Sequence, residues 1–487
     1  MAVASNEAGL KSSVTTRISY LKIIRPFAES VPKGMIFNMN TEWLCDTPIH
    51  SDVEAKLRHL LVELGNADKI LGIQVCAYKD GRVIIDTAAG VMGKDDPRPV
   101  QPDTLFPIFS ATKGITTGMI HWLADKGKLK LDEYVANIWP EFAINGKDKI
   151  KVHHILNHTS GLHNALPGIS LDPVAYCDWD ECMKRIAMVA PDTEPGHEQI
   201  YHFLSYGWLC GGIIEHASGK MFQDILEQAL VRPLKVEGEF YIGIPLGVES
   251  RVATVTYDKT EFSRFAALSA IIKDTPYAAM PSSLSPDIIA SLIHLCNSLD
   301  AQRAVIPAGN GNISARALAR YYVALVDGGI VPSHHSSSFP PLGSHPHHPK
   351  SSNPKSDLDN AILETGDTIE EPDTKIFNNP KSTIHDAFLG TGDYKDLVLP
   401  DGKFGLGFRR IKTTEGSVIG FGHAGLGGST GYGDINNRFS IAVTINKLSF
   451  SALTTGEIIR FVCSELDLPV PEDYAVSWDL NAKPVIN

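Results

Sequence analysis

The order of the predicted secondary structure constrains the fold most, because strands lie near both ends of the chain and helices lie between them. Near the start, residues 71–77 and 82–87 read as strands around Lys79-Asp80-Gly81, a typical hairpin-turn sequence. Short β-type runs return late in the chain, at residues 405–411, 417–421 and 438–446. We therefore predict an α/β (α+β) fold, in which one antiparallel sheet is built from both ends and flanked by helices, with an inserted all-helical subdomain.

Apolar periodicity predicts the helices. Asp52 can cap a helix over residues 52–64, and a second helical pattern begins at Ser110. Further helices are predicted at residues 207–217, 222–231, 315–326 and 451–466. These helices supply the layers that the predicted sheet needs to bury its two faces.

A length of 487 residues would suit roughly three domains. A sheet that uses both ends of the chain instead favours one composite domain over residues 51–466, with a leader at 1–50 and a tail at 467–487. Residues 331–382 are rich in His, Ser and Pro and then acidic, so we predict a disordered insert. Its histidines suit a polar linker better than a metal site; they are His334, His335, His345, His347 and His348.

Charge and cysteine content narrow the function classes. The net charge is −12 and no dense Lys/Arg cluster occurs, which argues against nucleic-acid binding and against anionic membrane surfaces. No apolar stretch approaches the ~18 residues of a membrane span. Seven scattered cysteines without a CxxC pair favour a reducing compartment. We expect a cytoplasmic protein, with an organellar transit peptide before Pro26 as the alternative.

Ser110 and Lys113 form a Ser-x-x-Lys pattern in Phe109-Ser110-Ala111-Thr112-Lys113. On a helix, positions i and i+3 face the same side, so the Lys113 amine can reach the Ser110 hydroxyl. A serine hydroxyl needs such a base to become a nucleophile, and the helix N-terminus would favour the developing oxyanion. Taken alone, the pattern favours the alternative of a capping serine and a surface lysine.

Three stretches together carry a family resemblance. Residues 103–116 (DTLFPIFSATKGIT), 127–132 (GKLKLD) and 156–162 (LNHTSGL) resemble the class C β-lactamase, penicillin-binding-protein and family VIII esterase group of serine hydrolases. The resemblance covers roughly residues 53–330 and 383–466. It implies a β-lactamase/transpeptidase-like fold and catalysis without a cofactor. Similar plant domains sometimes follow a kinase-like domain, but this chain has no kinase motifs.

The resemblance extends to Tyr201, which follows the Pro195-Gly196 pair by five residues, as in the family. A positive charge on Lys113 would lower the pKa of the Tyr201 phenol, which could then act as a base or relay a proton. The alternative is a core tyrosine with a satisfied hydroxyl. Phe203 stands where the lactamases usually have asparagine, and phenylalanine cannot hold the amide of a β-lactam. This departure favours the esterase branch.

A third motif, Gly422-His423-Ala424-Gly425, occupies the place of the family's Lys-Thr-Gly. Gly425 would let substrate lie close to the strand, and the Leu426 amide would form an oxyanion hole with the Ser110 amide. His423 replaces the usual lysine, so we expect its charge to depend on pH. The alternative is a glycine-rich turn with an exposed histidine.

Two other patterns compete for a functional role. Residues 427–431 match the G-x-S-x-G nucleophile elbow around Ser429. That motif needs a helix directly after it and a histidine later in the chain, and we predict a turn residue instead. His154 and His158 stand four apart but lack the glutamate of a zinc-protease helix, so metal binding is not favoured.

These observations predict a serine hydrolase that forms an acyl-enzyme on Ser110, with a small-molecule ester or amide, most readily a carboxylic ester, as substrate. Lys113 and Tyr201 would move protons, without a metal or organic cofactor. β-Lactamase or peptidase activity, and a non-catalytic scaffold that keeps the fold, remain alternatives. The sequence does not fix the oligomeric state.

Overall fold

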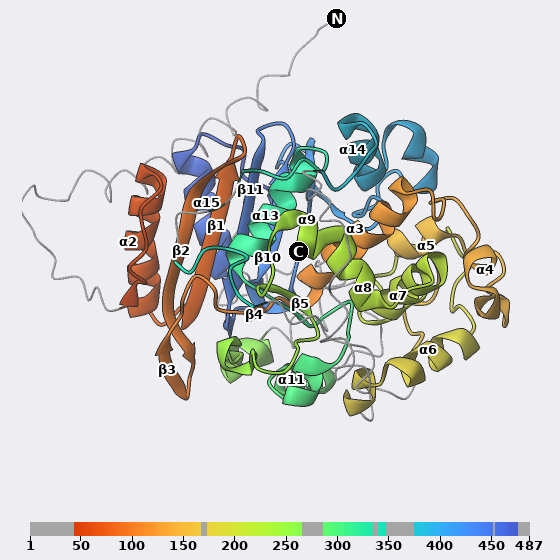
Figure 1. Cartoon of the computed structure of the whole chain (residues 1–487), viewed down its shortest axis with the longest axis horizontal. Helices are drawn as coiled ribbons and strands as arrows, with labels where there is room; N and C mark the ends of the chain where they lie inside the picture. Colours follow the sequence, from red (N-terminus) through yellow and green to blue (C-terminus); the bar gives the residue numbers. More distant parts are fainter. Residues whose placement is uncertain are drawn as a thin grey trace, which may run out of the picture. The chain divides into compact units, whose positions relative to one another are not determined.

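A computed structural model describes residues 43–166, 173–264, 286–333, 335, 339–346, 375–450 and 453–475. Its main feature is a seven-stranded sheet in which all neighbouring strands are antiparallel, in the order β3-β2-β1-β11-β10-β9-β8 (Figure 1). The strands are β1 (Gly72–Lys79), β2 (Arg82–Gly93), β3 (Asp96–Pro99), β8 (Arg409–Lys412), β9 (Val418–Ala424), β10 (Thr430–Asp434) and β11 (Phe439–Ile445). Because β1 pairs with β11 along its length, the prediction of one sheet built from both ends is confirmed.

The β1–β2 hairpin follows directly from its turn residues. Asp80 and Gly81 both have positive φ angles, of 52° and 75°, and Lys79 pairs with Arg82. A two-residue turn of this kind matches the twist of the strands, and glycine adopts it without steric cost. The local sequence therefore fixes the register of the first two strands.

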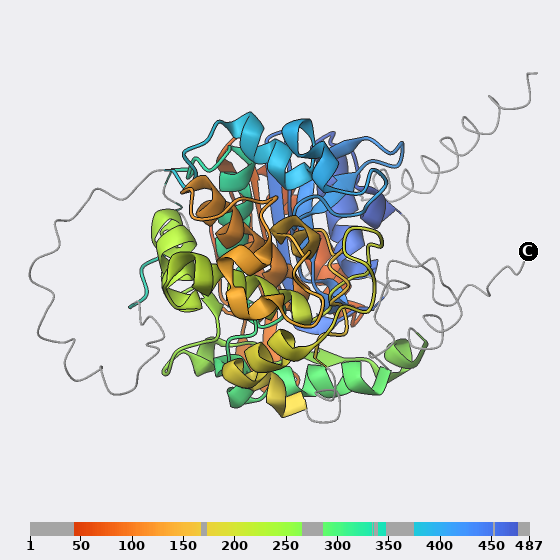
Figure 2. The same ribbon diagram turned by 90° about the vertical axis from the view of Figure 1, so that its right-hand side faces the viewer.

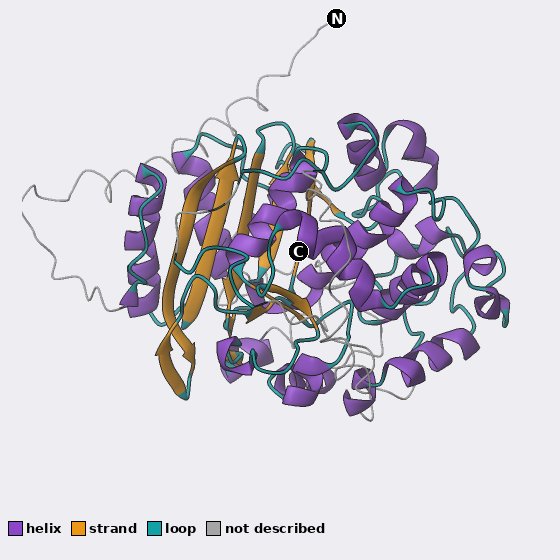
Figure 3. Cartoon of the chain, viewed as in Figure 1, coloured by secondary structure: helices purple, strands orange, loops and turns teal. Residues whose placement is uncertain are grey.

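Helices cover both faces of the sheet (Figure 3). On one face, α2 (Asp52–Asn66) and α15 (Leu453–Glu465) bury Leu57, Leu61 and Val462 against alternate strand residues. On the other face, α13 (Ala315–Val326) and α3 (Thr112–Asp125) belong to the larger core. Beside them gather α4 (Val135–Ile138), α5 (Val152–Leu156), α6 (Trp179–Met188), α7 (Ser205–Ser218) and α8 (Phe222–Leu226), which form the predicted helical subdomain (Figure 2).

The remaining elements are short. They are β4 (Phe106–Pro107), β5 (Phe240–Ile242), β7 (Gly311–Ile313), β6 (Thr256–Tyr257), β12 (Lys447–Leu448), α9 (Arg232–Leu234), α11 (Pro286–Cys296), α12 (Leu299–Arg303), α14 (Lys381–Leu389) and α16 (Glu472–Ala475). Strands β4, β7 and β5 form a small sheet that leads directly into the segment carrying Ser110. Helix α2 is capped by Ser51, whose hydroxyl accepts from the Glu54 amide at 3.1 Å, and not by Asp52 as predicted.

Residues 430–434, which follow Ser429 and were not predicted as a strand, form β10, which pairs with β11 on one side and β9 on the other. Its glycines are required by helix α13, which packs against this strand. A Cβ at Gly431 would lie 2.5 Å from the Tyr322 ring, and one at Gly433 would lie 2.3 Å from Val326. The glycines thus let α13 lie close to the sheet, a long-range requirement that a local pattern cannot reveal.

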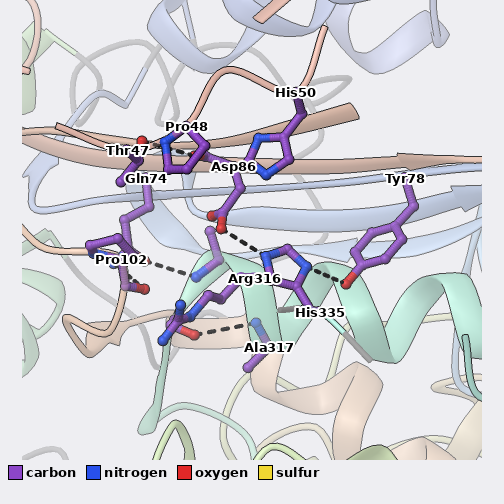
Figure 4. Close-up of polar contacts among 12 residues, drawn as sticks. Thr47, Pro48, His50, Gln74, Tyr78, Asp86, Pro102, Arg316, Ala317 and His335 are labelled. Atoms are coloured by element: carbon purple, nitrogen blue, oxygen red, sulfur yellow. Dashed lines mark hydrogen bonds and ion pairs between the residues drawn. The ribbon is translucent and has the colours of Figure 1, made fainter. Parts of the chain in front are cut away.

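The described parts of the predicted disordered insert, residues 331–382, are ordered and partly buried. Arg320 donates to the carbonyls of Pro332 and Ser333, both at 2.9 Å. His335 is buried between β-strand side chains, with Nε2 2.7 Å from Asp86 Oδ2 and Nδ1 2.9 Å from Tyr78 Oη (Figure 4). The prediction of disorder is therefore wrong for these residues, because buried polar partners elsewhere in the fold hold them. Residues 334, 336–338 and 347–374 lie outside the described part.

The ordered unit is also wider than the predicted domain of residues 51–466. Leu44 bridges to Ala89 and Pro471 bridges to Thr413, so both flanks contribute to it. Residues 1–42 of the predicted leader and 476–487 of the predicted tail lie outside the described part of the chain. All seven cysteines are free thiols. In the described part of the chain, every helix is too short or too polar to cross a membrane.

Candidate active site

Ser110 lies in a 3₁₀ turn, Phe109–Ala111, that runs directly into α3. The preceding residue, Phe109, has a positive φ of 48°, a strained conformation for a bulky side chain and one that is found most often at functional sites. The turn is held by Thr112, whose hydroxyl donates to the Phe109 carbonyl at 2.5 Å and accepts from the Gly311 amide at 2.9 Å. The fold therefore fixes the serine at the start of a helix, as its sequence context predicts.

Lys113 lies next to the serine, with its Nζ 3.0 Å from Ser110 Oγ and 3.0 Å from the Ala308 carbonyl oxygen. Its side chain is fully buried, and burial lowers the pKa of the amine well below the ordinary lysine value. A lysine whose amine pKa is lowered in this way gives up its proton more readily, which suits it to act as a base. Gly207 permits the approach of the Ala308 segment, since a Cβ there would lie 2.5 Å from the Ala308 nitrogen.

Tyr201 joins this pair from a loop before α7. Its ring centroid lies 4.9 Å from Lys113 Nζ, and the Phe203 ring lies 5.7 Å from the same atom. The Tyr201 ring also stacks on Phe404, at 5.8 Å between centroids. The structure thus brings together the three predicted catalytic residues.

Gly425 and Leu426 follow the end of β9 and lie against the serine segment. A Cβ at Gly425 would lie 2.2 Å from the Ile108 carbonyl oxygen, so only glycine permits this contact. Leu426 begins a 3₁₀ turn at Leu426–Gly428 and lines the same pocket as Ser110. This arrangement places the two backbone segments of the predicted oxyanion hole side by side.

His423 is 5% exposed, so it is not the exposed turn histidine of the alternative interpretation. Its ring lies 6.2 Å from the Tyr201 ring, and its Nδ1 lies 2.9 Å from the Ala424 carbonyl oxygen. Burial, reinforced by Lys113, lowers its pKa to about 3. His423 therefore stays neutral near neutral pH, and the expectation that its charge changes in that range is wrong.

His158 is a site residue that the sequence did not single out beyond a weak metal-ligand pattern. Its ring lies 4.8 Å from Tyr201, its Nδ1 accepts from the His202 amide at 3.1 Å, and its buried Nε2 meets no hydrogen-bond partner among the described residues. Burial lowers its pKa well below the usual value. Its place within residues 156–162, the third stretch of the resemblance, was the available signal. The described residues contain no cluster of three or more groups suited to a metal ion.

Ser429, the rival nucleophile, is fully buried and accepts a hydrogen bond from the Ile445 amide at 3.2 Å. A strand follows it, where a nucleophile elbow requires a helix. Its hydroxyl therefore supports the sheet, and Ser110 is the serine that lines a pocket.

Comparison with known proteins defines the family. The sequence profile described as Beta-lactamase matches residues 57–461. The chain belongs to the β-lactamase family. Among its relatives, Esterase/beta-lactamase LipL of Mycobacterium tuberculosis is 28% identical over 385 residues, which cover 77% of each protein. Esterase EstB of Burkholderia gladioli is 27% identical over 181 residues, which cover 34% of this chain and 46% of EstB.

Solved structures show the same fold. A penicillin-binding-protein homologue from Caulobacter crescentus superposes with a TM-score of 0.63 and 26% identity, over 87% of this chain and 99% of that one. A family VIII carboxylesterase gives 0.62 and 22% identity, over 86% and 98%, which shows a shared fold. The predicted β-lactamase/transpeptidase-like fold is confirmed, as is the assignment to the family's serine hydrolases.

Proposed function

We propose that this protein hydrolyses carboxylic esters through an acyl-enzyme on Ser110. The observation that carries the proposal is the distance of 3.0 Å between the Ser110 hydroxyl and a fully buried lysine amine whose pKa is well below normal. An amine with a lowered pKa at this distance can take the hydroxyl proton, which is the step that a serine nucleophile needs.

In the proposed acylation, Lys113 Nζ accepts the Ser110 proton while Oγ bonds to the ester carbonyl carbon. The resulting oxyanion is held by the backbone amides of Ser110 and Leu426, and one such donor is typically worth about 10²–10³ in rate. Collapse of this intermediate breaks the bond to the leaving alkoxide. The proton on Lys113 then reaches that oxygen through Tyr201, and an alcohol departs.

Deacylation repeats these steps with water as the nucleophile. Lys113 and Tyr201 take a proton from water as its oxygen bonds to the acyl carbon. The bond to Ser110 Oγ then breaks, the serine regains its proton, and a carboxylic acid leaves. Neither half-reaction needs a metal or an organic cofactor, since these side chains supply all the proton transfers.

Esters are favoured over amides by Phe203, whose ring lies beside Lys113 and lines the Ser110 pocket. A phenylalanine can neither donate nor accept the hydrogen bonds that would orient an amide side chain of a substrate. The name of EstB includes esterase, and the name of LipL includes both esterase and beta-lactamase, so ester hydrolysis is the activity that the two names share. β-Lactam and peptide hydrolysis are the competing activities within the fold.

The test compares wild type with Ser110→Ala on p-nitrophenyl acetate and on a chromogenic cephalosporin, with Ser429→Ala as the matched control. We expect ester turnover in wild type and in Ser429→Ala, and only background in Ser110→Ala. Equal rates for wild type and Ser110→Ala would reject the proposal and favour a non-catalytic scaffold. Faster cephalosporin than ester turnover would favour a β-lactamase.

We further propose a small-molecule substrate and a cytoplasmic location. The net charge of −12 argues against a nucleic-acid partner, and the seven free thiols fit a reducing compartment. Detection of the full-length protein in a cytosolic fraction would support the location, and exclusive recovery from an organelle would reject it.

A further inference from the structure

A pocket adjoins Ser110, and its walls come from segments that are distant in sequence. Ser110, Phe203 and Leu426 line it on the side of the nucleophile, and helix α11 closes it with Ile289, Leu292 and Ile293. Ile289, Ile293 and Leu426 also belong to one small buried apolar cluster. The empty space between these walls, counted together with the open mouth, is about 610 Å³.

The chemistry of the walls defines what the pocket can hold. None of its lining residues, all of which lie in the described part of the chain, carries a charge. Asn310 uses its amide on the protein: Nδ2 donates to the carbonyls of Ala301 and Ala304, and Oδ1 accepts from the Ile306 amide. A substrate group in this pocket would therefore gain from burying apolar surface and would find few hydrogen-bond partners.

The position of the proton-transfer groups indicates which half of an ester enters. The leaving alcohol must receive a proton, so it faces Lys113 and Tyr201. Tyr201 packs with His423 and Phe404 in a separate group of rings. The acyl group instead stays bonded to Ser110 Oγ throughout the acyl-enzyme, and the apolar pocket begins at that serine.

From this geometry we propose, building on the proposed function, that the substrates are esters of medium-length apolar fatty acids, with the acyl chain seated between Phe203 and α11. Phe203 is the specificity-determining residue, because its ring lies in the pocket wall, with its centroid 5.7 Å from Lys113 Nζ, and fills space that a longer chain would use. Each added methylene should raise kcat/KM about fourfold until the pocket is full, from the transfer free energy of a buried CH₂.

The experiment measures kcat/KM for p-nitrophenyl esters from acetate to dodecanoate. We expect a rise from acetate to an optimum at medium length. Leu292→Trp should lower the ratio of octanoate to acetate at least tenfold by filling the pocket. Phe203→Ala should move the optimum to longer chains. Met221→Trp, at a side chain that is 44% exposed, is the control and should keep the wild-type ratio.

A second series holds the acyl group constant and lengthens the alcohol. The pocket assignment would be overturned if kcat/KM did not change with the length of the acyl chain. It would also be overturned if the ratio of octanoate to acetate were unchanged in both Leu292→Trp and Phe203→Ala. Stronger dependence on the alcohol than on the acyl chain would overturn the orientation. These outcomes all require ester turnover that depends on Ser110, so they are distinct from failure of the proposed function, in which no ester is hydrolysed.

Discussion

Replacement of Gly425 by alanine tests the oxyanion hole through a single close contact. Gly425 has ordinary extended angles, φ −94° and ψ 162°, so alanine could adopt its backbone conformation. The added Cβ, however, would lie 2.2 Å from the Ile108 carbonyl oxygen. Non-bonded heavy atoms need about 3.5 Å, so the end of β9 and the Ser110 segment must separate by more than about 1 Å.

That separation carries the Leu426 amide away from the oxyanion. Loss of one such donor costs about 10²–10³ in rate, and a displacement of about 1 Å alone costs about 10². We expect Gly425→Ala to lower kcat on p-nitrophenyl acetate at least about 100-fold, with a smaller change in KM. The assay is steady-state hydrolysis, with thermal unfolding measured on the same sample to show that the variant is folded.

The control is Gly456→Ala in α15, where the nearest atom to an added Cβ is the flexible Arg460 guanidinium at 3.0 Å. We expect Gly456→Ala to keep wild-type kcat. A folded Gly425→Ala protein with full kcat would refute the reasoning, because it would show that turnover does not need this contact.

Three further predictions concern ionisation and buried charge. Since burial lowers the pKa of Lys113, kcat/KM should rise with pH through that lowered pKa and become constant well below pH ~10. The Lys113→Arg variant, whose side chain cannot lose its proton, should show kcat/KM about 10²–10⁴ lower than wild type. A kcat/KM that still rises with pH near pH ~10 would contradict this prediction. Burial lowers the pKa of His121 to about 4, below its value in the unfolded chain. As the pH falls from ~6.5 to ~4, this group should therefore lower the free energy of unfolding by about 1.4 kcal/mol per pH unit. Urea titrations of His121→Gln should show a weaker dependence of this free energy on pH, and an identical dependence would refute the prediction. Glu239 and Arg316 form a fully buried ion pair at 2.5 Å, so Glu239→Gln should lower the free energy of unfolding in urea by about 3 kcal/mol. The more exposed Glu249, which pairs with Arg303, should lose less than ~1 kcal/mol in Glu249→Gln. Equal losses in the two variants would contradict the role of burial.

The sequence predicted the features that depend on local pattern. The β1–β2 hairpin was predictable because Asp80 and Gly81 suit its turn. Helix α13 matches its predicted bounds because its apolar periodicity is strong. The Ser110–Lys113 contact was predictable because side chains three positions apart lie on the same face of a helix.

The features that the sequence missed depend on distant residues. Gly431 and Gly433 were not predicted as strand residues, and only the position of α13 explains why glycines stand in this strand. His335 read as linker, because its partners Asp86 and Tyr78 are about 250 residues away in the chain. The neutral state of His423 depends on burial, which no motif encodes.

The central claim is that Ser110, activated by Lys113, is the nucleophile. The most direct measurement is to treat the protein with a fluorophosphonate probe and to map the adduct by mass spectrometry of its peptides. We predict a single phosphonylated residue, Ser110, with labelling abolished in Ser110→Ala and slowed in Lys113→Met. An adduct at Ser429, at Ser160 or at any other residue would contradict the assignment.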